Sequence, residues 1–402
     1  TARMMQNNDI SIIWASFLMK IVGLWLATNR NEQRRRDFAL MYTVGALFIS
    51  ICIAIRDIYH TWGNFGVSTQ RFRFDRSLCY SLSFRALIFF NLITFTQKNF
   101  WRPYHDPQEI LVVADCKRIC NIFIILMIFC TQGTCAGYMV TPLIANIGRN
   151  ESDRILPFNL WVDLPVGMSP YFEILFTIQI LCVYHVGVCY ICFDNLLCIV
   201  NLHVASQFRI LQHRLRNIDN ATKDQIEKYE SDAKLSYYSN ICYAKLKNCV
   251  LQHQMLIEYC KKLENIFTLI VLETSCHYRS LIFPFHDRSS LLFRSGEADL
   301  PLSLLNLCGV LCQLLMFTYS CDDLMRQSVN VGNATFSGPW TILPMNEAGA
   351  TVRKNLLIII MRSHKICCIT AGKFFPVSLQ TFTGVIELVV SPLRFFYIIV
   401  EL

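Results

Sequence analysis

Residues 370–382 read Thr370-Ala-Gly-Lys-Phe-Phe-Pro-Val-Ser-Leu-Gln-Thr-Phe382 and begin the apolar segment that closes the chain. Gly372 suits a turn because it lacks a Cβ atom, and Pro376 has a fixed φ that suits the first turn of a helix. The apolar segment also carries polar or small residues at helical spacing: Ser378, Thr381 and Gly384. A helix surrounded only by lipid does not need them, so we predict a helix that lines a water-filled path.

The composition around this segment is that of a membrane protein. Of the 402 residues, 53% are hydrophobic and 16% are charged, whereas soluble domains carry about 25% charged residues. The net charge of +8 comes from basic residues spread between apolar runs. This spread fits loops that face anionic lipid, and it argues against a nucleic-acid partner.

Nineteen cysteines are present, and many of them lie inside apolar runs, where cysteine behaves as a small hydrophobic residue. Cys189 and Cys192 form a CxxC pair, but a second pair with zinc spacing does not accompany it. We therefore expect packing roles for the cysteines, and no metal and no cofactor.

Seven segments are apolar enough to cross a bilayer, which needs about 20 residues each. These segments are 38–58, 77–97, 119–148, 171–204, 263–282, 300–321 and 374–400. The basic run 34–36 marks a cytoplasmic flank. We predict an all-α, seven-transmembrane protein with a cytoplasmic N-terminus and an extracellular C-terminus.

This order of spans divides the chain into four parts. They are a cytoplasmic N-terminal segment (1–37), spans one to six with a cytoplasmic extension at 205–262 (38–321), a cytoplasmic segment with a short amphipathic helix at 352–365 (322–373), and span seven (374–402). The sequon at Asn150 falls in the outer loop 149–169, so we expect glycosylation there.

Several segments together resemble the insect odorant receptor family, above all the large receptor set of ants, bees and wasps. They are Thr131-Gln-Gly, Trp161-Val-Asp-Leu-Pro, Tyr184-His-Val-Gly-Val-Cys, Leu314-Leu-Met-Phe-Thr-Tyr-Ser-Cys, Arg353-Lys-Asn-Leu-Leu-Ile-Ile-Ile-Met-Arg362 and 370–382. With their flanks they cover most of 110–260 and 310–391. Residues 60–100, 274–301 and those after Ser391 depart from the family pattern, which keeps a non-functional product of an imperfect gene model open as an alternative.

The resemblance implies a tetrameric, ligand-gated, non-selective cation channel in the plasma membrane of olfactory sensory neurons. This chain is similar to the tuning subunits, which bind a small volatile hydrophobic molecule and assemble with an obligate co-receptor. In the family, the ligand lies in the outer half of the spans, the last helix lines the pore, and the cytoplasmic segment before it anchors the subunits together.

Residues for these roles follow from type and position. A small hydrophobic ligand suits an apolar cavity with a few polar groups, and candidates on spans three and four are Gln132, Thr134, Tyr138, Gln179, Val183, Tyr184 and Gly187. Ordinary helix packing is the alternative for each of them. We interpret His185 as a buried histidine with its hydrogen bonds satisfied in preference to a pocket residue.

Span seven supplies a candidate pore face, and Glu387 there would favour cations. The pore-lining candidates are Gln380, Thr383, Ile386, Glu387 and Val390. Candidates for the subunit anchor are Trp340, Arg353, Arg362 and Lys373, and a solvated amphipathic helix is the compatible alternative for them.

Other function classes fit less well. The chain has neither the Asp/Glu-Arg-Tyr nor the Asn-Pro-x-x-Tyr motif of G-protein-coupled receptors, which nevertheless share seven spans. It has no Ser/His/Asp set and no glycine-rich phosphate loop, so we expect no catalytic residues and no enzyme activity. A gustatory-type receptor of the same architecture remains an alternative.

Overall fold

The computed structural model describes most of the helical bundle. The described residues are 17, 20, 23, 29–60, 106–157, 167–218, 240–268, 271–272, 300–338, 340 and 347–387. Of the predicted spans, the second, most of the fifth and the end of the seventh lie outside these residues.

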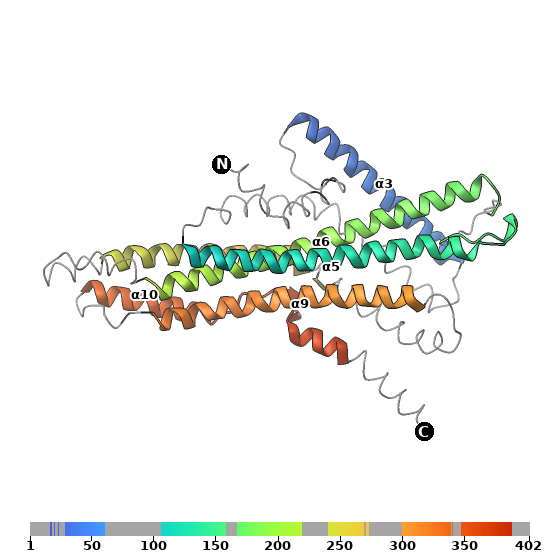
Figure 1. Ribbon diagram of the computed structural model, residues 1–402. Coiled ribbons are helices and arrows are strands. Elements are labelled where there is room, and N and C mark those ends of the chain that lie inside the picture. Colours follow the sequence, from blue (N-terminus) through green and yellow to red (C-terminus); the bar gives the residue numbers. More distant parts are fainter. Residues whose placement is uncertain are drawn as a thin grey trace, which may run out of the picture.

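Three long helices form the body of the fold (Figure 1): α5 (Pro107–Ala145), α6 (Tyr171–Arg216) and α9 (Leu300–Phe336). They lie side by side, with α6 in contact with both of the others. The shorter helix α3 (Arg30–His60) contacts α6. We call the end of the bundle that holds residues 146–157 the loop end, and the opposite end, where α10 (Glu347–Ser363) packs on α9, the α10 end.

Helix α5 begins where its sequence supplies a start signal. Asp106 caps α5 because its carboxylate accepts a hydrogen bond from the Gln108 amide at 3.0 Å, and Pro107 occupies the first turn. The same hydrogen bond, followed by one from His213, lowers the pKa of Asp106. Between α5 and α6, η1 (Glu151–Asp153) forms one short turn.

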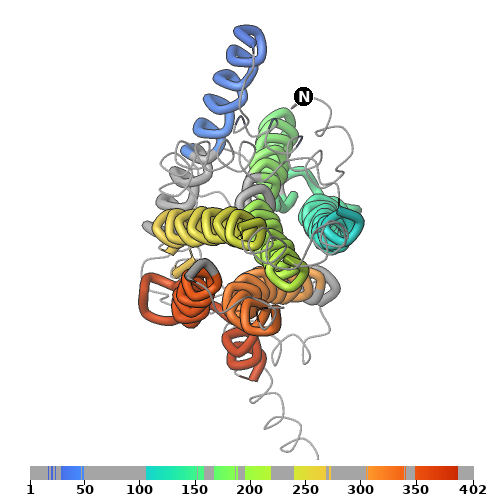
Figure 2. The backbone as a smooth tube through the Cα atoms, turned by 90° about the vertical axis from the view of Figure 1, so that its left-hand side faces the viewer, coloured from blue at the N-terminus to red at the C-terminus, as the bar shows by residue number. Residues whose placement is uncertain are grey.

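The largest core lies at the α10 end, where α6, α9, α10 and helical residues 240–268 meet (Figure 2). Its fully buried side chains include Phe208, Leu211, Tyr259, Leu263 and Met316. Toward the loop end, α5 exposes large apolar side chains such as Ile125, Phe129 and Ile144. That difference fits a chain whose α10 end packs on itself and whose other end faces lipid.

Helices α5 and α9 are among those that extend beyond the apolar segments predicted. The helix of span three begins at Pro107 instead of residue 119, and that of span six continues to Phe336 instead of ending at 321. Asp322 and Asp323 do not end the second helix because each pairs with an arginine, Arg326 and Arg209 respectively. The predicted amphipathic helix at 352–365 is α10.

Length and hydropathy alone identify few spans. Among the described residues, only Leu307–Phe336 is both long and apolar enough to cross a membrane, and Tyr171–His185 is a shorter apolar helix.

Candidate functional site

The predicted pore helix follows a short hairpin. Strands β1 (Thr370–Ala371) and β2 (Phe375–Pro376) pair antiparallel, and Gly372 and Lys373 between them both have positive φ, 60° and 64°. Glycine adopts that backbone conformation without steric cost, which explains its place in the turn. Helical residues 379–387 then begin directly after the hairpin.

Thr268 attaches the hairpin to helical residues 240–268. Its carbonyl oxygen accepts a hydrogen bond from the Gly372 amide at 2.8 Å, and its hydroxyl donates to the Thr370 carbonyl at 2.9 Å. The Lys373 amide donates to the same hydroxyl at 3.2 Å. The start of helix 379–387, the predicted pore helix, is therefore fixed to a helix that lies more than 100 residues earlier in the chain.

A second attachment comes from α9. The carboxylate of Asp322 accepts a hydrogen bond from the Leu379 amide at 3.4 Å and pairs with Arg326 at 2.6 Å. A carboxylate at a helix N-terminus satisfies a free amide and interacts favourably with the helix dipole. Asp322 thus acts as a cap that one helix supplies to another.

Helix 379–387 has two different faces. Phe382 and Val385 pack against Leu314 of α9. The opposite face is exposed and carries Gln380, Thr383, Gly384 and Glu387, which recur at helical spacing. Of the predicted pore-lining residues, Gln380, Thr383 and Glu387 lie on this exposed face and Ile386 is half-buried beside it. Val390 lies outside the described residues.

The predicted ligand-binding residues divide by burial. On α6, Gln179 is buried, and Val183 and Gly187 are half-buried along the same stripe. Thr134 and Tyr138 of α5 are also half-buried. Gln132 and Tyr184 are exposed and do not join them. A Cβ atom on Gly187 would lie 3.3 Å from the Thr131 methyl group, so α5 and α6 approach closely at this level.

His185 is buried and hydrogen-bonded, as predicted. The Thr43 hydroxyl donates to the Ala39 carbonyl at 2.8 Å and accepts from Nε2 of His185 at 2.9 Å. The His185 ring also meets Tyr42 edge-on, with the ring centroids 4.9 Å apart. His185 therefore joins α6 to α3.

The anchor candidates make contacts within the chain. The Trp340 indole donates to the Thr335 carbonyl, and its ring packs against the main core. Arg362 is half-buried and donates to the Lys365 carbonyl at 3.0 Å, and Arg353 is half-buried too. Lys373 is exposed in the hairpin turn.

Sequence reasoning missed a second apolar face on α10. Val352, Leu356 and Ile359 are buried against the core. Three other apolar side chains of α10 are exposed: Leu357, Ile358 and Met361, at 61%, 57% and 74%. We call these three the α10 stripe. Their spacing of one and four residues was a signal, since it lies outside the face that packs inward.

Two ion pairs that join distant segments were also missed. Arg209 donates through Nη2 to both carboxylate oxygens of Asp323, at 2.6 and 2.8 Å. Arg214 forms a two-point pair with Glu109, at 2.6 and 2.9 Å, and Glu109 is buried. These pairs join α6 to α9 and to the first turn of α5.

The loop end exposes the predicted glycosylation site. Asn150 is exposed and precedes η1. The Asn146 side chain fixes this loop because its amide exchanges two hydrogen bonds with the backbone of Ile155, at 2.7 and 2.9 Å.

Comparison with known proteins identifies the fold. The structure is similar to that of the insect olfactory receptor OR5 from Machilis hrabei, with a TM-score of 0.74, 12% identity and 97% of each chain covered. The same receptor in complex with eugenol gives a TM-score of 0.71 at 13% identity, over 95% of this chain and 97% of that one.

Curated relatives agree. Odorant receptor 10 of Aedes albopictus is 24% identical over 58% of this chain and 58% of its own length. Odorant receptor 30a of Drosophila melanogaster is 22% identical over 71% of this chain and 69% of its own length. This chain matches 57% of the length of Odorant receptor Or2 of Anopheles gambiae. It therefore spans less than two thirds of the length of that receptor and of the Aedes albopictus receptor.

A family model described as 7tm Odorant receptor matches residues 89–390, which is most of the chain. The predicted all-α, seven-transmembrane class is confirmed, and the relatives are receptors, not enzymes. The chain therefore belongs to the seven-transmembrane odorant receptor family and is a multi-pass membrane protein.

Proposed function

We propose that this chain is a tuning odorant receptor subunit. It binds a small volatile hydrophobic molecule and, together with a co-receptor subunit, opens a non-selective cation channel in the plasma membrane of olfactory neurons. The observation that carries this proposal is the two-faced helix 379–387, which packs on α9 by Phe382 and Val385 and leaves a polar face open. A helix with that division suits a position between its own subunit and a shared aqueous path.

The polar face has the chemistry of a cation path. Gln380, Thr383 and Glu387 follow one another at about one turn each, so they form a polar line roughly 10 Å long. Amide and hydroxyl groups can replace part of an ion's water shell, and a carboxylate attracts cations. Repetition of this line in neighbouring subunits would surround the path with polar groups.

The α10 stripe supports assembly. Three large apolar side chains on one helix face leave a contiguous surface that water solvates poorly. We assign this surface to the contact with a neighbouring subunit. Arg353, Arg362, Trp340 and Lys373 then support the anchor from within the subunit.

The ligand is proposed to lie among the inward-facing residues between α5 and α6. Gln179 supplies a buried amide, and Val183, Gly187, Thr134 and Tyr138 lie half-buried on the two helices. Such a lining suits a small, largely apolar molecule with one or two polar groups. Eugenol, bound by the structurally similar receptor, has that character.

Electrophysiology tests the proposal directly. The chain is expressed with and without the co-receptor, and currents are recorded while a panel of volatiles is applied. Odorant-evoked currents are expected only with the co-receptor, and they should persist when G-protein signalling is blocked. Loss of the currents under that block would contradict the channel assignment.

Two variants connect the current to the structure. Gln179→Leu should change the odorant response without changing ion selectivity, because Gln179 lies on α6 whereas helix 379–387 packs on α9. Glu387→Lys should reduce cation current without shifting odorant sensitivity. If both variants alter the same property, the proposed separation of ligand site and pore is wrong.

A further inference from the structure

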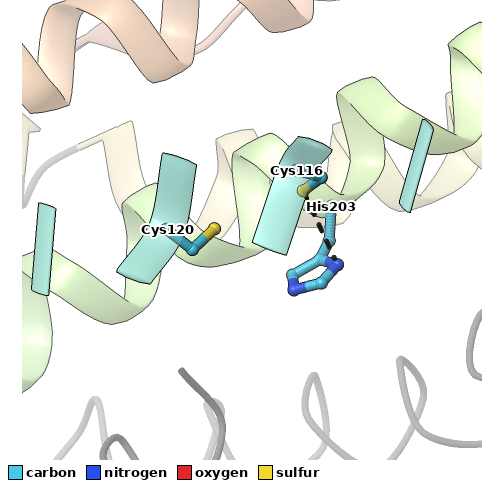
Figure 3. A group of neighbouring side chains, drawn as sticks. All are labelled: Cys116, Cys120 and His203. Carbon is cyan, nitrogen blue, oxygen red and sulfur yellow. Dashed lines mark hydrogen bonds between the residues drawn. The ribbon is translucent and has the colours of Figure 1, made fainter. Parts of the chain in front are cut away.

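One cluster of metal-binding side chains lies between α5 and α6 (Figure 3). Cys116 and Cys120 are four residues apart on α5, and His203 comes from α6. The Cys116 sulfur lies 3.9 Å from Nδ1 of His203, and the three potential ligand atoms all lie within 4.8 Å of one another. Two helices thus bring two thiols and one imidazole to a single point.

The spacing of these atoms is close to that of a zinc site. With Zn–S bonds of about 2.3 Å and Zn–N bonds of about 2.0 Å, tetrahedral ligands lie roughly 3.5–3.8 Å apart. For one sulfur and one nitrogen ligand the expected separation is about 3.5 Å. The observed 3.9 Å between the Cys116 sulfur and Nδ1 of His203 exceeds it by about 0.4 Å. Small side-chain rotations are enough to close the set around an ion.

Because the site is buried, its net charge determines which metal ion it can hold. Cys116, Cys120 and His203 are 2%, 0% and 9% exposed, and the surrounding side chains include Ile124, Ile199 and Leu202. Net charge is costly in such surroundings. Two thiolates and a neutral imidazole around Zn²⁺ have zero net charge, whereas the same ligands around Cu⁺ would leave one negative charge.

The other thiol cluster among the described residues fails this test. Cys130 of α5 and Cys308 and Cys312 of α9 also lie close together. Three thiolates around Zn²⁺ would carry one negative charge, and Cys308 is exposed to the surroundings of the bundle. Charge balance therefore favours the site that contains histidine.

We propose that Cys116, Cys120 and His203 bind one Zn²⁺ ion that joins α5 to α6. Binding releases the two thiol protons, and Nδ1 is the imidazole ligand because it faces Cys116. Three protein ligands leave one position for a water molecule. The role is structural: the ion holds the two helices at a fixed spacing near the α10 end, independently of whether the channel conducts.

The test uses the full chain in lipid nanodiscs, purified with a tag free of histidine and cysteine. Zn²⁺ binding is measured by titration, and the absorption-edge spectrum of the wild-type protein gives the ligand shell. We expect one ion, with two sulfur neighbours at about 2.3 Å and two nitrogen or oxygen neighbours at about 2.0 Å, from the imidazole and the water molecule. A shell of three sulfurs, a shell without sulfur, or no binding would overturn the proposal.

Two matched variants locate the site on α5. Cys116→Ser should weaken Zn²⁺ binding roughly 100-fold or more, since losing a ligand costs more than losing an outer partner. Cys130→Ser changes a cysteine of the same helix with similar burial, 4%, and should leave binding unchanged. The reverse pattern would assign the ion to the other cluster. The wild-type spectrum remains decisive if a variant fails to fold.

Discussion

The α10 stripe gives the sharpest prediction about assembly. The triple substitution Leu357→Ser, Ile358→Ser and Met361→Ser removes three side chains that are 61%, 57% and 74% exposed in the single subunit. Together, these fractions amount to about two whole side chains, each contributing roughly 2 kcal/mol when it is buried. Assembly should therefore weaken by about 4 kcal/mol per interface, or roughly 1,000-fold in the association constant.

The assay measures assembly and folding separately. Fluorescence-detected size exclusion reports the fraction of subunits in the complex, and thermal unfolding in detergent reports the fold. The triple variant should unfold like the wild-type subunit but elute as a smaller species. As a matched control on the same helix, Leu356→Ser changes a residue that is 4% exposed, and it should lower unfolding temperature instead. Unchanged assembly of the triple variant would refute the assignment of the stripe to a subunit contact.

Four further predictions follow from single residues. Burial lowers the pKa of His253 to about 4 from the usual 6.5, so the unfolded chain binds the proton first as pH falls. The free energy of unfolding should thus fall by up to about 3 kcal/mol as the pH drops from 6.5 to 4. The His253→Gln variant should show a smaller fall when unfolding is measured over the same pH range. Glu387→Gln should lower the ratio of divalent to monovalent cation permeability severalfold, as measured from reversal potentials. A ratio equal to that of the wild type would show that this residue does not line the pore. Asn150→Gln should abolish a glycosidase-sensitive shift in electrophoretic mobility, and a wild-type protein without that shift contradicts the predicted outer loop. Gly372→Ala puts a Cβ atom 2.6 Å from the Leu272 side chain at a φ of 60°, so it should cost about 1–2 kcal/mol or more in thermal unfolding.

Local patterns in the sequence predicted the parts of the fold that depend on local chemistry. Gly372 was predicted at a turn, and it lies in the hairpin turn with a φ of 60°. Pro376 was predicted in the first turn of a helix, but it lies in β2 and the helix begins at residue 379. The amphipathic pattern of residues 352–365 predicted α10, and the structure extends that helix over Glu347–Ser363 with one apolar face buried. His185 was interpreted correctly because a histidine inside an apolar helix is stable only when its nitrogen atoms find partners.

Contacts between residues that are far apart in the sequence could not be predicted from local patterns. Arg209 and Asp323 are 114 residues apart in the chain, and only the packing of α6 on α9 makes them partners. Their pairing also explains why the charge at residue 323 does not end a helix that hydropathy alone would stop at 321. Cys116, Cys120 and His203 meet for the same reason, since α5 and α6 must first pack.

One discrepancy was accessible from helix geometry. Gln132 and Thr134 are two residues apart, so on a helix their side chains point about 200° apart and cannot share one lining. The structure has Gln132 exposed and Thr134 half-buried. Residue type had suggested both, and the helical angle selects between them.

The length of α6 has a mechanical consequence. Its 46 residues form one helix about 69 Å long. Gln179 lies toward one end of this helix, and the ion pairs at Arg209 and Arg214 lie toward the other. An unbroken helix transmits rotation as a rod does, so a tilt of about 3° at one end displaces the other by roughly 3–4 Å. A small rearrangement at the loop end would thus shift α6 against α9, the helix whose Asp322 accepts a hydrogen bond from the Leu379 amide at the start of helix 379–387.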